Sequence, residues 1–560
     1  MDYSAQFGTR KTPQSEKIPG SKQAENSAGG FAFAVDDWTR LDRFLVLGNE
    51  GGSYYATERA MTKESAEAVL RCINADGKRA VGRIVEISHG GRAPKNDPAI
   101  FALAMAASLG DQQTKAIALD ALSKVCRIGT HLFHFAQAAQ SFRGWGRGLR
   151  RAVGGWYLGK SAEDLAWQII KYQQRDGWSH RDLLRLSHPK AEDATLNGVL
   201  KWAVGKAGGE VDLPVVRGFE LAQKSIEEKD GKRSMVIKPK EAAKIIAEYG
   251  LPREAVPTEW LMSGEVWAAL LEEMPMTAMI RNLATMTRVG LIGPMGDATV
   301  KITAELLNQE RLRKARVHPI AILAATLTYA SGHGVRGKAE WSPVAAIVDA
   351  LDRAFYLSFG NVEATGKRIV LALDVSGSME GGVVAGVPGL TPRVASAAMA
   401  LVTANIEPNH CFVAFTSGQP GEWSCTQSNK SQWSRSRGIR NSITELTISP
   451  RQRLDDVCKQ VSGLPMGGTD CALPMLWALD KKLKADAFVV LTDSETWAGE
   501  IHPVQALRDY RAKMNVPAKL IVIGMVSNNF SIANPDDGGM LDVIGFDTAT
   551  PQLISDFIRQ

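Results

Sequence analysis

The chain has 560 residues, of which 45% are hydrophobic and 22% are charged, and its formal net charge is +6. This length exceeds what one hydrophobic core usually supports, so we expect at least two folded domains and exclude a disordered or fibrous protein. The longest apolar run, at 320–330, is too short to span a bilayer, and all of the excess positive charge lies in residues 1–360.

The cysteines form no C-x-x-C pair and have no histidine at zinc-site spacing. They are Cys72, Cys126, Cys411, Cys425, Cys458 and Cys471. Neither a zinc site nor a disulfide framework is therefore indicated, and we expect a reducing, cytoplasmic compartment and no membrane association.

Residues 1–30 are rich in Ser, Gly, Lys, Glu and Gln and contain no apolar stretch like the core of a signal peptide. We predict a disordered N-terminal extension. Residues 31–362 are predicted to be mainly helical, because apolar residues recur there at spacings of three and four. The clearest examples are 97–108, 114–126, 264–274, 277–286 and 318–330. Stacked helix pairs favour a helical-repeat array, although no clean sequence period is present. Residues 207–243 fit this pattern poorly and suggest a loop or an insertion.

Residues 121–160 contain seven Lys or Arg and no Asp or Glu. A solvated helix usually mixes charges of both signs, so this stretch predicts a surface for a polyanion such as RNA. The basic residues are Lys124, Arg127, Arg143, Arg147, Arg150, Arg151 and Lys160. Aromatic residues are interleaved with them, and these either stack on unpaired bases or belong to the core, which is the favoured interpretation for Trp156 and Tyr157.

The stretch 169–190 carries further basic residues. Lys171 and Arg175 are four residues apart, which predicts one helical face, and a Gly-Trp-Ser turn then leads to a helix with Arg181 and Arg185 that ends at His188. A single histidine near a helix end is usually structural.

Residues 363–560 alternate short apolar runs with helical stretches. The runs are 367–374, 411–417, 486–493 and 518–525, and the predicted helices are 394–404, 451–461, 471–484 and 502–514. Uniformly apolar strands are buried on both faces, so we predict an α/β domain of Rossmann-like type with a mainly parallel sheet. Ligands of such domains bind at the carboxyl ends of the strands.

Hard oxygen donors follow these strands. Asp374, Ser376 and Ser378 come after the first strand, and Thr469 and Asp493 lie near later strand ends. This set suits a divalent cation, most simply Mg²⁺. The alternative is that the serines only cap a helix and Asp493 only ends a strand, and Asp470 is either a helix cap or a ligand. Glu495 is the only obvious extra acid, so we expect no enzymatic activity.

The set D-x-S-x-S, a Thr in a Gly-rich loop and a later Asp resembles the metal-ion-dependent adhesion site of von Willebrand factor A domains. Other motifs, taken with this one, resemble the Ro autoantigen family with its TROVE module over residues 31–560. They are "GNEGGSYY" (48–55), "VCRIGTHLFHF" (125–135), "MPMTAMIRNLATM" (274–286), "KARVHPIAIL" (314–323), "YASGHGVRGKAEW" (329–341), "GGTDCALPM" and "LTDSETWAG".

The resemblance implies a monomeric ring of HEAT-like repeats closed by the A domain. It also implies that Y RNAs bind the basic outer surface, that single-stranded ends of misfolded RNAs enter the central hole, and that a 3′ exoribonuclease such as polynucleotide phosphorylase is a partner. The expected RNA-binding residues are Lys171, Arg175 and His188 by resemblance, and Arg127, Arg143, Arg147, Arg150 and Arg185 by charge.

Two loops, 381–393 and 417–440, are longer than the family pattern requires and are expected to border the metal site. The competing hypothesis is a protein-docking module of adhesion type, in which an acidic residue of a partner completes the coordination of Mg²⁺ and RNA is incidental.

Overall fold

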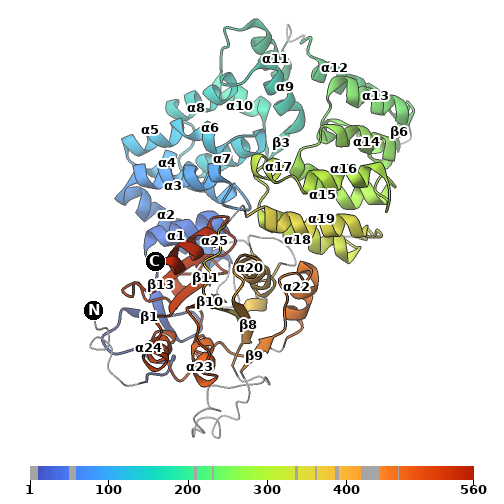
Figure 1. Cartoon of the computed structure of the whole chain (residues 1–560). Coiled ribbons are helices and arrows are strands. Elements are labelled where there is room, and N and C mark those ends of the chain that lie inside the picture. The colour runs from blue at the N-terminus through green and yellow to red at the C-terminus, as the bar shows by residue number, and fades with distance from the viewer. Residues whose placement is uncertain are drawn as a thin grey trace.

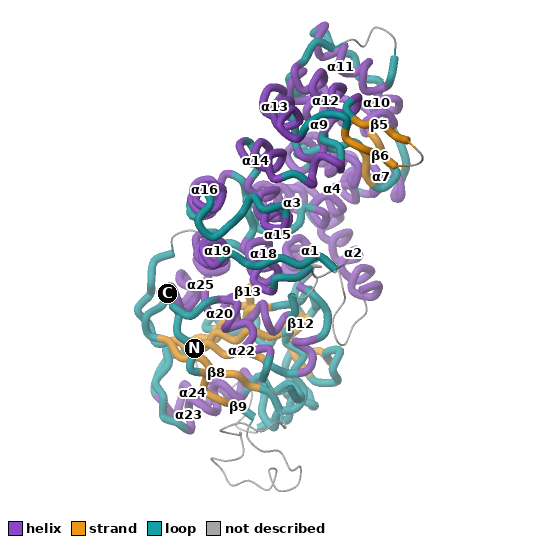
Figure 2. Tube along the Cα trace, turned by 90° about the vertical axis from the view of Figure 1, so that its right-hand side faces the viewer, coloured by secondary structure: helices purple, strands orange, loops and turns teal. Residues whose placement is uncertain are grey.

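The structure is a computed structural model that describes residues 11–48, 58–206, 211–229, 232–334, 338–359, 362–384, 390–417, 442–464 and 466–560. An arc of helices rises from an α/β domain and returns to it, which closes a ring (Figure 1). The view turned by 90° shows the helices as a slanted column above the sheet of the A domain (Figure 2). The predicted combination of a helical ring and an α/β domain is confirmed.

The first limb of the arc runs from α1 to α11. Its helices are α1 (Asp37–Leu47), α2 (Glu58–Ala75), α3 (Gly77–Gly90), α4 (Asp97–Leu109), α5 (Gln112–Asp120), α6 (Leu122–Val125), α7 (Gly129–Phe142), α8 (Arg147–Leu158), α9 (Ala162–Lys171), α10 (His180–Ser187) and α11 (Ala194–Val204). A short hairpin, β3 (Gln174–Arg175) and β4 (Trp178–Ser179), lies between α9 and α10. Many of these helices begin at an Asp or Ser whose side chain accepts a backbone N–H of the first turn, as Asp36, Asp76 and Ser161 do.

The second limb runs from α12 back to the A domain. Its elements are α12 (Pro214–Lys224), β5 (Ile226–Lys229), β6 (Lys232–Met235), α13 (Pro239–Tyr249), the 3₁₀ helices η2 (Arg253–Ala255) and η3 (Thr258–Met262), α14 (Gly264–Glu272), α15 (Met276–Arg288), α16 (Asp297–Leu306), α17 (Gln309–Lys314), α18 (Pro319–Ser331) and α19 (Ala345–Leu357). Neighbouring helices pack in pairs, such as α13 with α14 and α18 with α19. Within 207–243, where the sequence suggested a loop or insertion, the described residues form α12 and the β5–β6 hairpin.

The A domain contains a six-stranded sheet in the order β13-β11-β10-β7-β8-β9, parallel except for β9. The strands are β7 (Ile369–Asp374), β8 (His410–Phe415), β9 (Ile443–Leu446), β10 (Ala487–Thr492), β11 (Lys519–Gly524) and β13 (Met540–Ile544). The helices are η4 (Gly377–Glu380), α20 (Pro392–Ile406), α22 (Leu454–Ser462), α23 (Leu473–Asp480), α24 (Pro503–Met514) and α25 (Thr550–Arg559). The four predicted strands are present as β7, β8, β10 and β11, and β7 and β10 are buried along their whole length.

The described part of the N-terminal segment is ordered and packs on the A domain. Strands β1 (Gln23–Glu25) and β2 (Phe31–Ala34) pair with each other, and β2 pairs with β12 (Phe530–Ser531). Gln14 is fully buried, and its side-chain amide donates to Asp470 Oδ1 and to the Ile501 carbonyl, both at 2.8 Å. The predicted disordered extension is therefore wrong for residues 11–30, because its polar side chains find fixed partners that composition does not show. Residues 1–10 lie outside the described residues.

The predicted boundary at residue 31 falls at the start of β2, which pairs with β12. The first helix, α1, begins at Asp37. At the other boundary, α19 ends at Leu357 and β7 begins at Ile369, on either side of the predicted division at 362/363.

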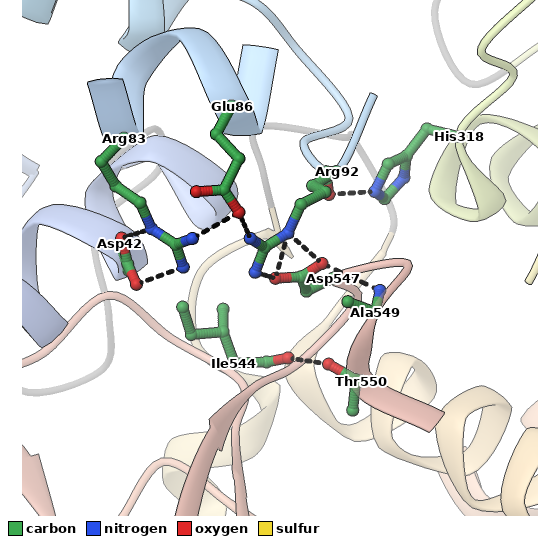
Figure 3. Close-up of polar contacts among 9 residues, drawn as sticks. All are labelled: Asp42, Arg83, Glu86, Arg92, His318, Ile544, Asp547, Ala549 and Thr550. Atoms are coloured by element: carbon green, nitrogen blue, oxygen red, sulfur yellow. Dashed lines mark hydrogen bonds and ion pairs between the residues drawn. The ribbon is translucent and has the colours of Figure 1, made fainter. Parts of the chain in front are cut away.

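The two limbs and the A domain meet at one junction (Figure 3). Arg92, after α3, places its Nε 2.9 Å from Asp547 Oδ1 in the A domain. His318, before α18, donates from Nε2 to the Arg92 carbonyl at 3.0 Å. The ion pair continues through Glu86 and Arg83 to Asp42 of α1. The ring is therefore closed by contacts among the first helices, the last helices and the A domain.

Candidate RNA-binding surface and metal site

Helix α8 has one buried side and one arginine side. Its buried residues are Leu149, Val153, Gly154, Trp156 and Tyr157. Arg147, Arg150 and Arg151 are exposed, as is Arg143 at the end of α7. In the described chain, none of these four arginines forms an ion pair with a carboxylate or another hydrogen bond through its side chain. Four of the seven predicted basic residues of this stretch thus carry positive charge that no carboxylate of the described chain neutralises.

The interleaved aromatic residues are mainly core. Trp156 and Tyr157 are buried, with the Trp156 indole donating to the Cys126 carbonyl and the Tyr157 hydroxyl 2.9 Å from His180 Nδ1. Phe133 and Phe135 are also buried. The prediction that Trp156 and Tyr157 belong to the core is therefore confirmed.

Helix α10 packs beside α8 and extends the arginine side. Gly154 of α8 lies against Ser187 and Pro189, at the end of α10. Arg185 and His188 are exposed there. His188 adopts a left-handed conformation with φ 47° and donates its N–H to the Leu184 carbonyl at 2.9 Å, so it also ends the helix. We call Arg143, Arg147, Arg150, Arg151, Arg185 and His188 the basic face.

Lys171 and Arg175 do not share a helical face, contrary to the prediction from their spacing. Helix α9 ends at Lys171, and Arg175 lies in the β3–β4 hairpin. Asp176 and Gly177 form its turn with φ values of 52° and 77°, the Asp-Gly geometry that a tight hairpin prefers. His134 contacts the Asp176 carboxylate at 2.5 Å and so holds the hairpin against α7. Arg175 is exposed at the side of this hairpin.

Lys171 is half-buried and packs against aromatic rings. Its Nζ lies 4.4 Å from the centre of the Trp167 ring. Burial lowers the pKa of Lys171, and the nearby Glu254 carboxylate opposes this. Arg127, also predicted to bind RNA, donates to Ser88 Oγ at 3.0 Å, and its pKa is lowered by burial and by Arg316. The structure thus groups Arg127 with Arg316 near the ring junction and not with the exposed arginines of α8.

The five predicted metal ligands are all buried in the A domain. Asp374 ends β7, and its carboxylate accepts the Ser376 N–H at 2.9 Å and the Thr492 hydroxyl at 2.6 Å. The Ser376 and Ser378 hydroxyls are 3.0 Å apart. The Gly377 N–H donates to the Gly467 carbonyl at 2.9 Å, which holds the Thr469 loop against the 374–378 loop.

The electrostatics of this cluster suit a cation. Burial, followed by the neighbouring Asp374 carboxylate, raises the pKa of Asp493 to about 8. Burial also raises the pKa of Asp374. Thr469 Oγ1 is buried without a hydrogen-bond partner in the described chain. The nearest guanidinium, Arg393, donates to backbone carbonyls and pairs with Glu380 at 3.1 Å. Two carboxylates and three hydroxyls are therefore arranged as hard oxygen donors that can hold a divalent cation.

Asp470 and Glu495 have partners outside this donor set. Asp470 accepts the Ala472 N–H at 3.1 Å and the Gln14 amide, but the N-cap residue of α23 is Ala472, so Asp470 is not the cap of that helix. Glu495 accepts the Ala28 N–H at 3.2 Å and the Asn528 amide at 3.3 Å. Sequence reasoning missed Thr492 and Gln14. Thr492 could have been found, because it lies at the end of β10, a strand that pairs with β7. No feature of the sequence pointed to Gln14. Of the two long loops, 385–389 and 418–441 lie outside the described residues.

Comparison with known families matches both parts of the chain. A model of the Ro60 vWA domain matches residues 368–558, and a model of the TROVE domain matches residues 24–212 and 248–328. The chain is 41% identical over 549 residues to RNA-binding protein RO60 of Deinococcus radiodurans, covering 98% of this chain and 97% of that protein. The chain belongs to the Ro60 family.

A second relative and a solved structure extend this likeness. RNA-binding protein RO60 of Caenorhabditis elegans is 35% identical over 616 residues, covering 97% of this Ro60-family chain and 91% of the relative. The crystal structure of the Deinococcus radiodurans RO (RSR) protein aligns with a TM-score of 0.67 at 41% identity, over 94% of this chain and 99% of that one. Within the described ranges, no helix combines the length and the apolar character needed to cross a membrane.

Proposed function

We propose that this Ro60-family protein binds small noncoding Y RNAs on its basic face, and the single-stranded 3′ ends of misfolded RNAs in the hole of its ring, and so serves RNA quality control and small-RNA stability. The observation that carries this proposal is the basic face itself. Its arginines have no carboxylate partner among the described residues, so their charge is available to phosphates.

One further observation supports RNA as the ligand. Two relatives that match nearly the whole chain are named RNA-binding proteins. Side chains that contact phosphates position an RNA but do not read its sequence, so a basic surface combined with a ring would select RNA by shape and by free ends.

We further propose that the oxygen cluster of the A domain holds Mg²⁺ and that an acidic residue of a protein partner completes its coordination. The partner implied by the family resemblance is a 3′ exoribonuclease. The support is the buried Thr469 hydroxyl without a partner and the adjacent Asp374 and Asp493 carboxylates. In this proposal, the metal site serves docking and carries no catalytic step.

The experiment is a gel-shift titration across a salt series with two RNAs that share one stem, one blunt and one with a single-stranded 3′ tail. The variant Arg147→Gln/Arg150→Gln/Arg151→Gln removes three charges from α8. The control Lys481→Gln/Lys482→Gln/Lys484→Gln removes three exposed charges from the A domain.

We expect the α8 variant to weaken stem binding by at least tenfold. We also expect its salt dependence, in log Kd against log salt, to fall by about 2 to 3, since each phosphate contact contributes about 0.9 to that slope. The control variant should bind like the wild type. Equal, weak binding of both RNAs by all three proteins would contradict the RNA proposal. If a chelator abolished RNA binding while the fold stayed intact, the RNA-binding site would have to be assigned to the A domain.

A further inference from the structure

A cavity of about 370 Å³ lies where the second limb of the ring approaches the end of α3. Helix α15 lines one wall with Thr277, Ile280, Arg281 and Ala284, which share a face at helical spacing. Helix α18 lines the opposite wall with Ala321, Ala324, Ala325 and Thr328. Pro94, Lys95 and the segment 316–318 close the third side. The volume falls in the range of small-ligand sites, near its lower end.

The walls of this cavity suit a flat, largely apolar group. The alanines of α18 place only methyl groups on the wall, which leaves a slot between the two helices. Thr277 and Thr328 add hydroxyl groups that can bond the polar edge of a planar ring. The described structure thus provides apolar faces for stacking and polar atoms for orientation.

The lining residues at the ends of the walls carry positive charge. Arg281 is exposed on α15, and neither it nor Arg316 forms an ion pair with a carboxylate of the described chain. Arg316 has a left-handed backbone with φ 49°, packs against Gly91, and has its Nη2 3.4 Å from His89 Nε2. Arg127 lies close enough to Arg316 for its pKa to be lowered by that charge, after burial. Positive charges held together attract an anion when no carboxylate pairs with them.

We propose that this cavity binds one nucleotide unit, with its base in the slot between α15 and α18 and its phosphate on Arg281 and Arg316. An apolar slot with hydroxyls and cations matches a base and a phosphate better than it matches a lipid or a peptide side chain. The proposal rests on the proposed function in taking RNA as the source of the nucleotide, and a free nucleoside monophosphate is the other source of the same chemistry.

The position of the cavity gives such a nucleotide a second effect. Lys95 belongs to the first limb, whereas Arg316 and His318 belong to the second, and His318 also bonds the Arg92 carbonyl at the ring junction (Figure 3). A nucleotide that fills the cavity and also contacts Lys95 is held by both limbs, so it stabilises the junction in addition to occupying the cavity. We expect ligand binding to raise the temperature at which the ring unfolds.

The test uses the full chain and two probes, a ten-nucleotide single-stranded RNA labelled at its 5′ end and adenosine 5′-monophosphate. Ala324→Trp fills the slot, and Arg281→Gln removes a lining charge from the exposed side of α15. Arg288→Gln is the matched control, because it removes an exposed arginine of the same helix that does not line the cavity. Fluorescence anisotropy measures RNA binding, titration calorimetry measures binding of the monophosphate, and circular dichroism checks the fold.

We expect Ala324→Trp and Arg281→Gln each to weaken RNA binding about tenfold and Arg288→Gln to change it less than twofold. If the wild type binds RNA and the folded variants Ala324→Trp and Arg281→Gln bind it equally well, the cavity proposal is wrong. The proposed function then still stands. If the wild type binds adenosine monophosphate but no RNA, and Ala324→Trp loses this binding, the cavity is a site for free nucleotides. This result would refute the proposed function. Binding of neither probe overturns both.

Discussion

Two buried hydroxyls near the carboxyl ends of the A-domain strands, Thr469 Oγ1 and Ser494 Oγ, have no hydrogen-bond partner in the described chain. A buried hydroxyl without a partner costs free energy, so one that persists at a site of gathered oxygens indicates a ligand. Ser494 also has a strained left-handed backbone, with φ 61°, directly after Asp493. At the residue scale, the proposal of a metal site is therefore supported by unsatisfied donors as well as by the D-x-S-x-S pattern.

Magnesium should stabilise the A domain through Asp374. At a concentration about one hundred times the dissociation constant, Mg²⁺ should add about 2.7 kcal/mol to the free energy of unfolding. Thermal unfolding followed by circular dichroism should show this rise in the wild type and its absence in Asp374→Asn. Asp470→Asn is the control, because Asp470 is a neighbouring buried acid whose partners are Gln14 and Ala472. An unchanged magnesium response in Asp374→Asn would remove this residue from the site.

His318 should make the ring junction sensitive to acid. Its Nε2 donates to the Arg92 carbonyl and its Nδ1 accepts the Ile320 N–H, so only the neutral ring fits. Burial lowers its pKa from 6.5 to about 4, against the opposing attraction of Asp547. Because the folded pKa is depressed, the stabilisation is present above pH 6.5 and is lost as the pH falls towards 4. Acidification from pH 7 to pH 5 should cost about 2 kcal/mol through this residue.

Urea denaturation at both pH values measures this effect. His318→Gln can make the same two bonds but does not titrate, so it should lose about 2 kcal/mol less than the wild type over this range. His188→Gln is the control, since His188 is exposed. Equal losses in the wild type and His318→Gln would mean that the acid sensitivity of the ring arises elsewhere.

At the element scale, local patterns located most of the A domain but not the segment that covers it. Strand β10 is a continuous apolar run buried along its length, so its hydrophobicity alone identified it. Strands β1 and β2 are short, and their segment is held by side-chain bonds to residues more than 450 positions away, such as Gln14 to Asp470. Such contacts leave no periodic signal in a sequence, and composition then suggested disorder.

The N-terminal segment should stabilise the loops that carry the metal-site residues. Gln14 joins the Asp470 loop to the Thr496 loop through its amide group. Gln14→Ala should cost about 1 to 3 kcal/mol, because buried partners on both loops lose their hydrogen bonds. Urea denaturation of the full chain measures the loss. Lys17→Ala, an exposed change in the same segment, should have no measurable effect. If Gln14→Ala also leaves the free energy of unfolding unchanged, the N-terminal segment packs on the A domain without stabilising it.

The hairpin between α9 and α10 shows a second limit of local patterns. The four-residue spacing of Lys171 and Arg175 predicted a helix, but the Asp-Gly pair at 176–177 directed the chain into a tight turn. Turn chemistry overrides charge spacing because the spacing is worth only a few tenths of a kcal/mol. Arg175 consequently lies in a hairpin that His134 holds against α7, whereas Lys171, at the end of α9, packs on Trp167.

At the scale of the whole molecule, the ring depends on contacts that the sequence could not indicate. The family resemblance predicted closure by the A domain, but the residues that achieve it, Arg92, His318 and Asp547, lie far apart in the chain and belong to no common motif. Asp547 is almost fully buried, and besides Arg92 it accepts the Ala549 N–H at 3.0 Å (Figure 3). Its carboxylate therefore fixes the start of α25 and the end of α3 together.

Asp547→Asn should loosen this closure without unfolding either part. The amide still accepts the Ala549 N–H, but Arg92, which is mostly buried, keeps only Glu86 as a charge partner, and breaking the buried pair costs about 3 kcal/mol. Hydrogen exchange should accelerate in 88–96 and 544–550, and small-angle scattering should show a larger radius of gyration. Asp556→Asn, an exposed change in α25, should leave both unchanged. Exchange in 88–96 that stays as slow as in the wild type would show that the apolar contacts of α1 and α18 close the ring without this ion pair.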